Sequence, residues 1–201
     1  RSRSLAVAGN FNMTNPDELF NVLVDIGQHP RQTTDTITVL EKIGHFLDEE
    51  NQELFETYKK SYYTNVQITQ LIEENLNLQR VLRRACKDFD GGYTMAGLTG
   101  YGASFVVRDP NGIRPAYYYI DEEVVVVASE KPAIKTAFGV EYADIHEITP
   151  GHALIINKNG GSRQLEILPE GRKTSCSFER CLSTIGLWWS VATVARPCGS
   201  R

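Results

Sequence analysis

Residues 93–128 read YTMAGLTGYGASFVVRDPNGIRPAYYYIDEEVVVVA, and this stretch decides the fold class. From about Asp88 onward the apolar residues stop recurring every three or four positions and begin to alternate or to run together, as they do in strands. Residues 110–112 form a Pro-Asn-Gly turn, and the runs at 116–120 and 124–128 flank three acidic residues as the two arms of a hairpin. The pattern predicts a set of antiparallel strands.

The residues before this stretch begin with one short strand and a helix. Residues 4–8, SLAVA, form an apolar run that predicts a buried strand ending in a turn at Gly9, with a polar loop after it. Asn15 is expected to cap the next helix, because Pro16 suits the first helical position and Glu18 stands where a capping box needs an acid.

Helical spacing continues from there as far as residue 86. A second helix is expected to begin at Thr33 or Thr34, and residues 52–86 are expected to be helical throughout. Ser129 is expected to cap a short helix over residues 131–138. Two more strands are predicted, at 152–156 and 165–168. A strand, then helices, then antiparallel strands is the order of an α+β protein with layered sheets and helices.

The composition is that of a soluble globular domain. The 201 residues are 41% hydrophobic and 23% charged, with 21 basic and 25 acidic residues and a formal net charge of −4. This balance argues against a nucleic-acid partner held by a basic surface. No apolar run approaches the roughly 20 residues of a membrane helix, so no membrane partner is expected. Four cysteines are too few for a disulfide scaffold, which favours a reducing, cytoplasmic location.

Both ends of the sequence stand out. Residue 1 is Arg and not Met, which predicts that the sequence starts inside a longer protein. Residues 181–201 have no clear period and no acidic residue, and they hold both tryptophans. They are either a genuine apolar element or a non-native tail from a frame slip or a junction, and the change of character favours the tail. The expected organisation is a partial domain over 1–180 and a tail over 181–201.

Two groups of polar residues are candidates for binding, and each also has a purely structural interpretation. Gly9 and Asn10 follow a buried strand, where backbone N–H groups and a side-chain amide would converge on an oxyanion or a carboxamide, or would form a plain turn. Asp35 follows two threonines at a helix start, where it would bind a cation or simply stabilise the positive end of the helix.

Other polar residues are assigned to structure. Arg108, Asp109 and Arg114 flank the turn at 110–112 and are expected to form a salt bridge within the protein. The four histidines lack the spacing of metal ligands, so no metal site is expected.

Six short sequence motifs are informative as an ordered set: GNFNMTN at 9–15, TTDT at 33–36, RDPNGIRP at 108–115, ASEKPA at 128–133, ITPGHALII at 148–156 and CSFER at 176–180. Together they resemble the glutamine amidotransferase domain of the amidophosphoribosyltransferase family, which begins purine synthesis, over about residues 4–180. RDPNGIRP followed by ASE and PGH separates this family from related class II amidotransferases, including those that aminate sugar phosphates. The resemblance implies an N-terminal-nucleophile hydrolase fold, a four-layer αββα sandwich, here incomplete at the N-terminus.

The resemblance also implies roles for individual residues. In the family an N-terminal Cys attacks the side-chain amide of glutamine, its own α-amino group serves as the base, and a thioester forms. Gly9 and Asn10 match part of the oxyanion-binding motif, whereas Ala8 stands where that motif has an Asn. Asp35 matches the acid that binds the α-amino group of glutamine. No residue matches the nucleophile, so the sequence assigns three substrate-binding residues and no catalytic one.

The partners follow from the same resemblance. Family members pass ammonia to a phosphoribosyltransferase domain, where it displaces pyrophosphate from phosphoribosyl pyrophosphate with Mg²⁺ present. No string in these 201 residues matches that domain, so no cofactor is expected within them, and Cys176 alone does not support the iron–sulfur cluster of some relatives. The full-length protein is expected to be a homo-oligomer and this fragment to be inactive. The alternative is a non-catalytic regulatory or interaction module of the same fold, supported by Ala8.

Overall fold

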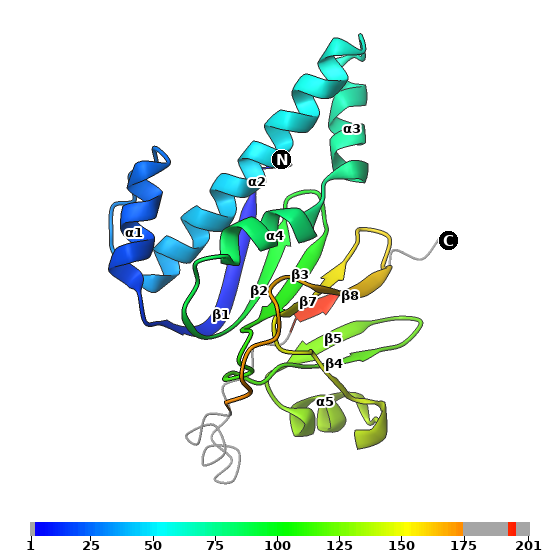
Figure 1. The fold of residues 1–201 in the computed structure, drawn as a ribbon. Helices are drawn as coiled ribbons and strands as arrows, with labels where there is room; N and C mark the ends of the chain where they lie inside the picture. The colour runs from blue at the N-terminus through cyan, green and yellow to red at the C-terminus, as the bar shows by residue number, and fades with distance from the viewer. Residues whose placement is uncertain (1–2, 175–192, 196–201) are drawn as a thin grey trace.

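The computed structural model describes residues 3–174 and 193–195, whose strands form two antiparallel sheets (Figure 1). The first sheet has five strands in the order β1 (Leu5–Met13), β2 (Gly91–Thr99), β3 (Ser104–Arg108), β7 (His152–Ile156) and β8 (Ser162–Glu166). The second sheet has four strands in the order β6 (His146–Glu147), β4 (Tyr117–Ile120), β5 (Val125–Ala128) and β9 (Thr193–Ala195).

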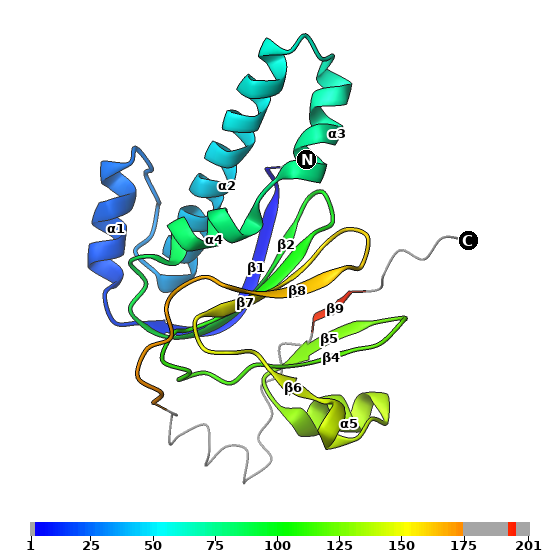
Figure 2. The same ribbon diagram turned by 45° about the vertical axis from the view of Figure 1, so that its right-hand side comes forward.

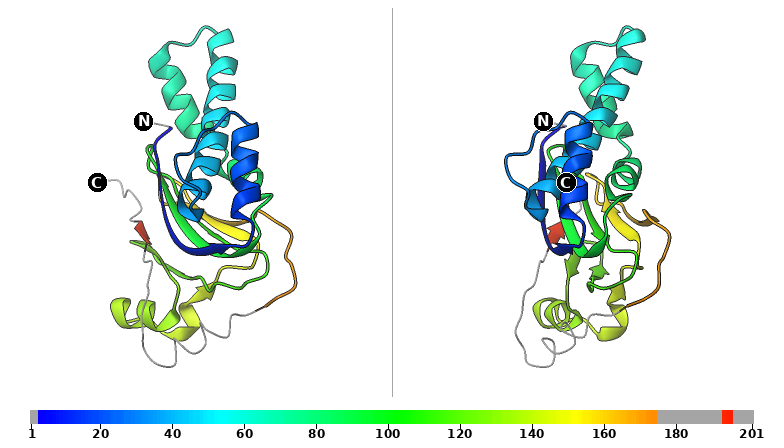
Figure 3. Two further views of the ribbon diagram at one scale, coloured as in Figure 1. Left: turned by 90° about the vertical axis from the view of Figure 1, so that its left-hand side faces the viewer. Right: turned by 60° about the vertical axis from the view of Figure 1, so that its left-hand side comes forward.

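The helices lie on the outer sides of these sheets. They are α1 (Pro16–Asp25), α2 (Asp35–Lys60), α3 (Asn65–Asn75), α4 (Leu78–Cys86), α5 (Lys131–Phe138) and the short 3-10 helix η1 (Tyr142–Asp144). Figures 1 and 2 show α1–α4 on one side of the first sheet and α5 beyond the second sheet. The two views of Figure 3 show that α2 and α3 form a hairpin that projects past the end of the first sheet.

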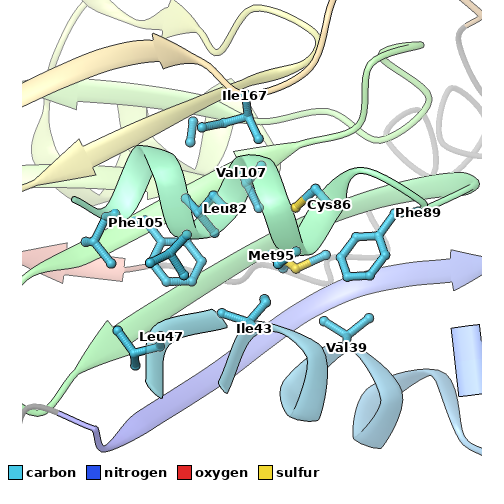
Figure 4. Packing of buried hydrophobic residues seen from close by; sticks show 14 of the residues in the cluster. Val39, Ile43, Leu47, Leu82, Cys86, Phe89, Met95, Phe105, Val107 and Ile167 are labelled. Carbon is cyan, nitrogen blue, oxygen red and sulfur yellow. The ribbon is translucent and has the colours of Figure 1, made fainter. Parts of the chain in front are cut away.

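The largest apolar cluster lies between the helices and the first sheet. Figure 4 shows Ile43 of α2 and Leu82 of α4 packed with Met95 of β2 and Phe105 of β3, and all four side chains are buried. The apolar stripes of α2 and α4 therefore cover one face of this sheet, as expected for amphipathic helices.

Strand β5 explains how the second sheet is held. Val125 and Val127 join a cluster with Val106 and Leu154 of the first sheet. The alternate residues of β5 join a separate cluster with Ile134 of α5. Since both faces of β5 are buried, its sequence is a continuous apolar run rather than an alternating one.

The predicted strand-rich stretch and the mixed α/β class are confirmed. The hairpin predicted around residues 121–123 is formed by β4 and β5, with Tyr117 opposite Ala128. β7 has the predicted bounds of 152–156, and α5 has the predicted bounds of 131–138. The second helix begins after Thr34, one of its two predicted start positions.

The predicted end of the first strand is wrong, and so is its predicted burial, since Met13 is the only buried residue of β1. β1 does not stop at a turn at Gly9 but continues to Met13, and every residue of it pairs with β2 in an unbroken register from Leu5 opposite Thr99 to Met13 opposite Gly91. The long ladder to β2 overrides the turn preference of the Gly-Asn sequence.

Residues 52–86 are not one helix. α2 ends at Lys60, and the chain reverses over residues 61–64, where Tyr62 has a φ of 63°. α3 then starts from a capping box in which the Thr64 hydroxyl accepts from the Gln67 N–H while the Gln67 side chain accepts from the Thr64 N–H. A second break at 76–77 separates α3 from α4.

Three smaller predictions also need correction. Asn15 precedes α1 as predicted, but its side chain makes no capping bond to the helix backbone. Glu130, not Ser129, is the residue that precedes α5. The last predicted strand lies at Ser162–Glu166 rather than at 165–168.

One close approach inside the first sheet requires glycine. Gly97 lies opposite Phe105 across the β2–β3 ladder, and a Cβ atom built at Gly97 would stand 2.1 Å from Cζ of that ring. The Phe105 ring therefore occupies the space over Gly97, and the pair fills the sheet face that α2 and α4 cover.

The non-native tail predicted for residues 181–201 lies mostly outside the described residues. Of that segment only Thr193–Ala195 are described, as strand β9, with Val194 opposite Val126 of β5. The predicted boundary at residue 180 also lies outside them. Among the helices of residues 3–174, none has the length and hydropathy that crossing a bilayer requires.

Candidate functional site

Two of the predicted site segments meet at one end of the first sheet. The backbone N–H of Met13, the last residue of β1, donates to Oδ2 of Asp35 at 2.9 Å. Asp35 is the first residue of α2 and is half-buried. A carboxylate suits this position because the free N–H groups of the first turn give a helix start a positive potential. The strand that carries Gly9 and Asn10 is thereby fixed to the helix that carries Asp35.

Gly9 lies in the middle of β1, opposite Met95, and not in a turn. A Cβ atom built at Gly9 would stand 2.5 Å from the carbonyl oxygen of Thr94, so the close approach of the β2 backbone accounts for a glycine here. Its neighbour Asn10 is an exposed residue of the same strand. Asn10 also interacts with another group of the protein, so it is not without a partner.

The direction of the Gly9 N–H follows from the hydrogen bonds at the two ends of β1. The Ser4 carbonyl accepts from Gly100 N–H and the Thr14 N–H donates to the Asp90 carbonyl, so these two residues face β2. Backbone groups alternate in direction along an antiparallel strand. Even-numbered residues of β1 therefore bond to β2, and the N–H of Gly9 points away from β2.

The loop between β1 and α1 is anchored to the turn that precedes β2. The Thr14 hydroxyl bonds to the Asp90 carboxylate, and the Asn15 side chain donates to the Asp88 carbonyl at 3.0 Å and accepts from the Asp90 N–H at 3.3 Å. Asn15 thus binds another loop instead of capping α1, which is why the predicted capping box is absent. The result is a fixed connection between β1 and the helices.

The RDPNGIRP string forms a buried structural junction. Arg108 is 3% exposed, and its guanidinium donates to the Glu147 carboxylate at 2.7 Å, which confirms the predicted salt bridge for this residue. Asp109 is 0% exposed and bonds to backbone instead: its carboxylate accepts from the N–H groups of Asn111, Ile113 and Arg114 at 2.9–3.0 Å. The junction ties the end of β3 to the loop that leads into the second sheet.

One buried polar cluster has no clear signal in the sequence. Lys42 of α2 is 1% exposed, donates to the Asp88 carboxylate at 2.8 Å and lies 5.3 Å from the centre of the Phe89 ring. Cys86 and Tyr93 are buried nearby. Burial raises the pKa of the Cys86 thiol to about 12 and raises the pKa of Tyr93 well above its usual value. Cys86 therefore stays protonated and is no nucleophile.

Two other kinds of site were considered within the described residues, a metal site and a cavity. Within residues 3–174, no three His, Cys, Asp or Glu side chains lie close enough to hold a metal ion. A polar cavity of about 810 Å³ lies at the other end of the first sheet, beside the β2–β3 turn, and includes Tyr101, Lys158 and Arg163 in its lining. None of Gly9, Asn10 and Asp35 lines that cavity.

Comparison with known proteins finds similarity to one group of enzymes. No protein-family profile matches it. It is 27% identical over 175 residues to the amidophosphoribosyltransferase of Methanothermobacter thermautotrophicus and 29% identical over 175 residues to that of Archaeoglobus fulgidus. Each match covers 87% of this chain but only 31% or 32% of the relative, so the chain spans about a third of the length of these curated relatives.

Solved structures agree on the fold. The glutamine phosphoribosylpyrophosphate amidotransferase of B. subtilis, complexed with ADP and GMP, matches with a TM-score of 0.59 at 24% identity. A structure described as the allosteric regulatory enzyme of purine biosynthesis matches with a TM-score of 0.57 at 22% identity. Each match covers 87% of this chain and 31% of the other. Sequence and fold thus both make this chain similar to amidophosphoribosyltransferase over 87% of its length, which confirms the resemblance that its motifs predict.

Proposed function

We propose that this chain is the glutaminase part of an amidophosphoribosyltransferase-like enzyme, which takes ammonia from glutamine for the formation of 5-phosphoribosylamine in purine synthesis. The observation that carries the proposal is the bond from Met13 N–H to Asp35, because it brings the GNFNMTN and TTDT strings together although they lie far apart in sequence. The archaeal relatives named amidophosphoribosyltransferase support the same assignment.

The proposal includes the finer fold assignment, a four-layer αββα sandwich of the N-terminal-nucleophile type. Its support is the order of the three apolar clusters. One lies between helices and the first sheet, one between the two sheets, and one between the second sheet and α5. Residues 1–180 would then form the partial domain.

The spacing along β1 suits glutamine as the ligand. Asn10 precedes Met13 by three residues, or about 10 Å at the rise of an extended strand. Glutamine spans about 5 Å from its α-amino nitrogen to its side-chain carbonyl carbon, and a hydrogen bond at each end adds about 3 Å. In this proposal Asp35 accepts from the α-ammonium group, while Gly9 N–H and the Asn10 amide bind the oxygen of the side-chain amide as it becomes an oxyanion.

The nucleophile in this proposal comes from outside the described residues. In residues 3–174 the only cysteine is Cys86, which is completely buried and has a raised pKa. The family mechanism needs a Cys whose α-amino group serves as its base, so that the thiol attacks the amide carbon, ammonia leaves and a thioester remains. We therefore propose that the 201 residues alone do not hydrolyse glutamine, and that an N-terminal Cys belongs to a longer form of the protein.

The remaining partners belong to that longer form. Phosphoribosyl pyrophosphate and Mg²⁺ are assigned to a transferase domain, and a cytoplasmic homo-oligomer is proposed for the whole protein. The proposal gives the described residues the role of binding glutamine, and it includes neither a metal nor a nucleic acid among their ligands.

The test is glutamine binding by a matched pair of variants. Asp35→Asn removes the charge that holds the ammonium group, so we expect L-glutamine affinity, followed by NMR line broadening on the 201-residue chain, to fall about 10- to 100-fold. Asp17→Asn is the control, because Asp17 is also an acid in the first turn of a helix but is exposed on α1. Equal glutamine affinity in wild type and Asp35→Asn would reject the assigned site.

A second candidate, a non-catalytic module of the same fold, rests on Ala8. Its side chain offers no hydrogen-bond donor at a position where the family motif has an Asn, and loss of one oxyanion donor costs about 10²–10³ in rate. A longer gene product that carries an N-terminal Cys discriminates between the two. Ammonia release from glutamine in the presence of phosphoribosyl pyrophosphate supports the enzyme, whereas binding of glutamine without turnover supports the module.

A further inference from the structure

Lys42 is a buried cation whose position is not explained by stability alone. Its side chain is 1% exposed, and its ammonium group donates to the Asp88 carboxylate at 2.8 Å. Lysine is almost never fully buried without a partner, and replacement of a buried ion pair by apolar residues of similar volume is often neutral or stabilising. Folding alone would thus be served as well by an apolar side chain, so the ion pair needs another explanation.

The partner of Lys42 belongs to the turn that holds the loop between β1 and α1. The Asp88 carbonyl accepts from the Asn15 side chain at 3.0 Å. Two residues on, the Asp90 carbonyl accepts from the Thr14 N–H at 3.0 Å, and the Asp90 carboxylate bonds to the Thr14 hydroxyl. This turn therefore binds both loop residues, and Lys42 fixes the turn to α2.

Lys42 and Asp35 lie on the same face of α2. They are seven residues apart, which is close to two helical turns, or about 10.5 Å along the helix axis. Asp35 accepts from the Met13 N–H at 2.9 Å, and Lys42 binds the turn that holds Thr14. The end of β1 and its loop are thus held to α2 at two points, one direct and one through the turn.

We propose that Lys42 is a positioning residue of the glutamine site. By fixing the turn at Asp88 it keeps the end of β1 against Asp35, so that the Asp35 carboxylate faces the α-ammonium group of glutamine. This inference rests on the proposed glutaminase function. The Lys42–Asp88 pair carries no net charge, so it acts through geometry and not through its electrostatic field. A carboxylate that binds both a backbone N–H and a ligand tolerates little displacement, because charge-assisted bonds depend on distance and direction.

Hydrogen exchange in the ligand-free chain tests the positioning role directly. Lys42→Met removes the bond to Asp88 but keeps an unbranched side chain of similar length, and it leaves behind a carboxylate that is 45% exposed to water. We expect the amides of Met13 and Thr14 to exchange about tenfold faster in this variant. The Ala8 N–H, which bonds to β2, should keep its exchange rate, and the midpoint of thermal unfolding should be no lower than that of the wild type.

Glutamine affinity tests the consequence for the site. Lys42→Met should weaken L-glutamine binding about 3- to 10-fold, less than Asp35→Asn does, because the carboxylate is displaced but still present. Lys42→Leu, a second apolar variant, should behave in the same way. Lys42→Arg keeps a cation with N–H donors and should bind glutamine within about twofold of the wild type. Lys60→Met is the matched control, because Lys60 is an exposed lysine at the other end of α2, and it should change neither affinity nor exchange.

Each outcome decides one part of the proposal. Unchanged exchange at Met13 and Thr14 in Lys42→Met overturns the positioning role. Equally faster exchange at Ala8, with a lower thermal midpoint, also overturns it and shows that Lys42 supports only the fold. Equal glutamine affinity in Lys42→Met and wild type, while Asp35→Asn binds more weakly, overturns the link to the site. If the wild type does not bind glutamine, or Asp35→Asn binds it equally well, the proposed function itself is rejected, and the exchange rates alone decide whether Lys42 positions the end of β1.

Discussion

Asp109 offers the sharpest test of the structural role given to the RDPNGIRP string. Its carboxylate is completely buried and accepts three backbone N–H groups, at 3.0 Å from Asn111, 2.9 Å from Ile113 and 3.0 Å from Arg114. Asp109→Ala leaves all three donors without an acceptor. Each buried donor that loses its partner costs about 1–3 kcal/mol, and entry of water into the half-buried loop reduces the sum. We therefore expect a loss of about 3–5 kcal/mol in the free energy of unfolding.

This loss is a large share of the stability of a domain, which is usually about 5–15 kcal/mol. For a chain of this length it corresponds to a fall of roughly 6–20 °C in the midpoint of thermal unfolding. The assay is thermal and urea unfolding of the 201-residue chain, followed by circular dichroism. The stability of Asp109→Asn should lie between that of the wild type and that of Asp109→Ala, because the asparagine side chain keeps one acceptor oxygen but turns an NH₂ group toward a backbone donor.

Asp121 provides the matched control. It makes the same kind of bond, since its carboxylate accepts from the N–H groups of Glu123 and Val124 at 2.7 Å, but it lies in an exposed turn. These two bonds lower the pKa of the Asp121 carboxyl. Water can take the place of that carboxylate, so Asp121→Ala should change the unfolding midpoint far less. An Asp109→Ala variant as stable as Asp121→Ala would refute the reasoning.

Two further predictions concern packing and pH. Gly97→Ala should destabilise the chain by about 1–3 kcal/mol in urea unfolding, because the new Cβ atom meets the Phe105 ring. Gly44→Ala in the middle of α2 should stabilise the chain by about 0.5–1 kcal/mol, because nothing lies within 4 Å of the new atom. Equal effects at the two sites would contradict the packing argument. Burial raises the pKa of Cys86 to about 12, above the roughly 8.5 of an unfolded thiol, so its contribution to stability is complete below about pH 8.5 and is lost as the pH rises toward 12. Between about pH 9 and about pH 10.5 the wild-type chain should lose about 2 kcal/mol more than Cys86→Ala, and parallel pH profiles would show that the thiol does not remain protonated.

The sequence predicts well those elements that local pattern determines. β4 and β5 follow from two apolar runs around an acidic turn, and α5 has the bounds that its spacing predicts. The sequence does not predict the break in the long helical region, because residues 61–64 contain neither glycine nor proline and because Tyr62 adopts a positive φ that its residue type does not signal. The sequence predicts β1 too short, because the length of this strand depends on a ladder to residues 91–99, which no local pattern encodes.

The candidate site was predictable only through the resemblance. Nothing in the spacing of Gly9, Asn10 and Asp35 indicates that they belong together, since the bond from Met13 N–H to Asp35 depends on the tertiary fold. The role of Asp109 had a usable signal, because an Asp before a Pro-Asn-Gly turn often binds backbone N–H groups a few residues on. Lys42 had no such signal, since its burial depends on Asp88 and Phe89, which lie far along the chain.

The pairing of β1 with β2 also has a consequence during protein synthesis. Leu5 meets its partner Thr99 only after α1–α4 have been made, and at 5–20 residues per second this interval is on the order of 5–20 s. For that time an uncharged strand leaves the ribosome with both of its edges open, while the helices behind it fold through local contacts. A chaperone that binds extended apolar segments would find such a segment in this strand during that interval.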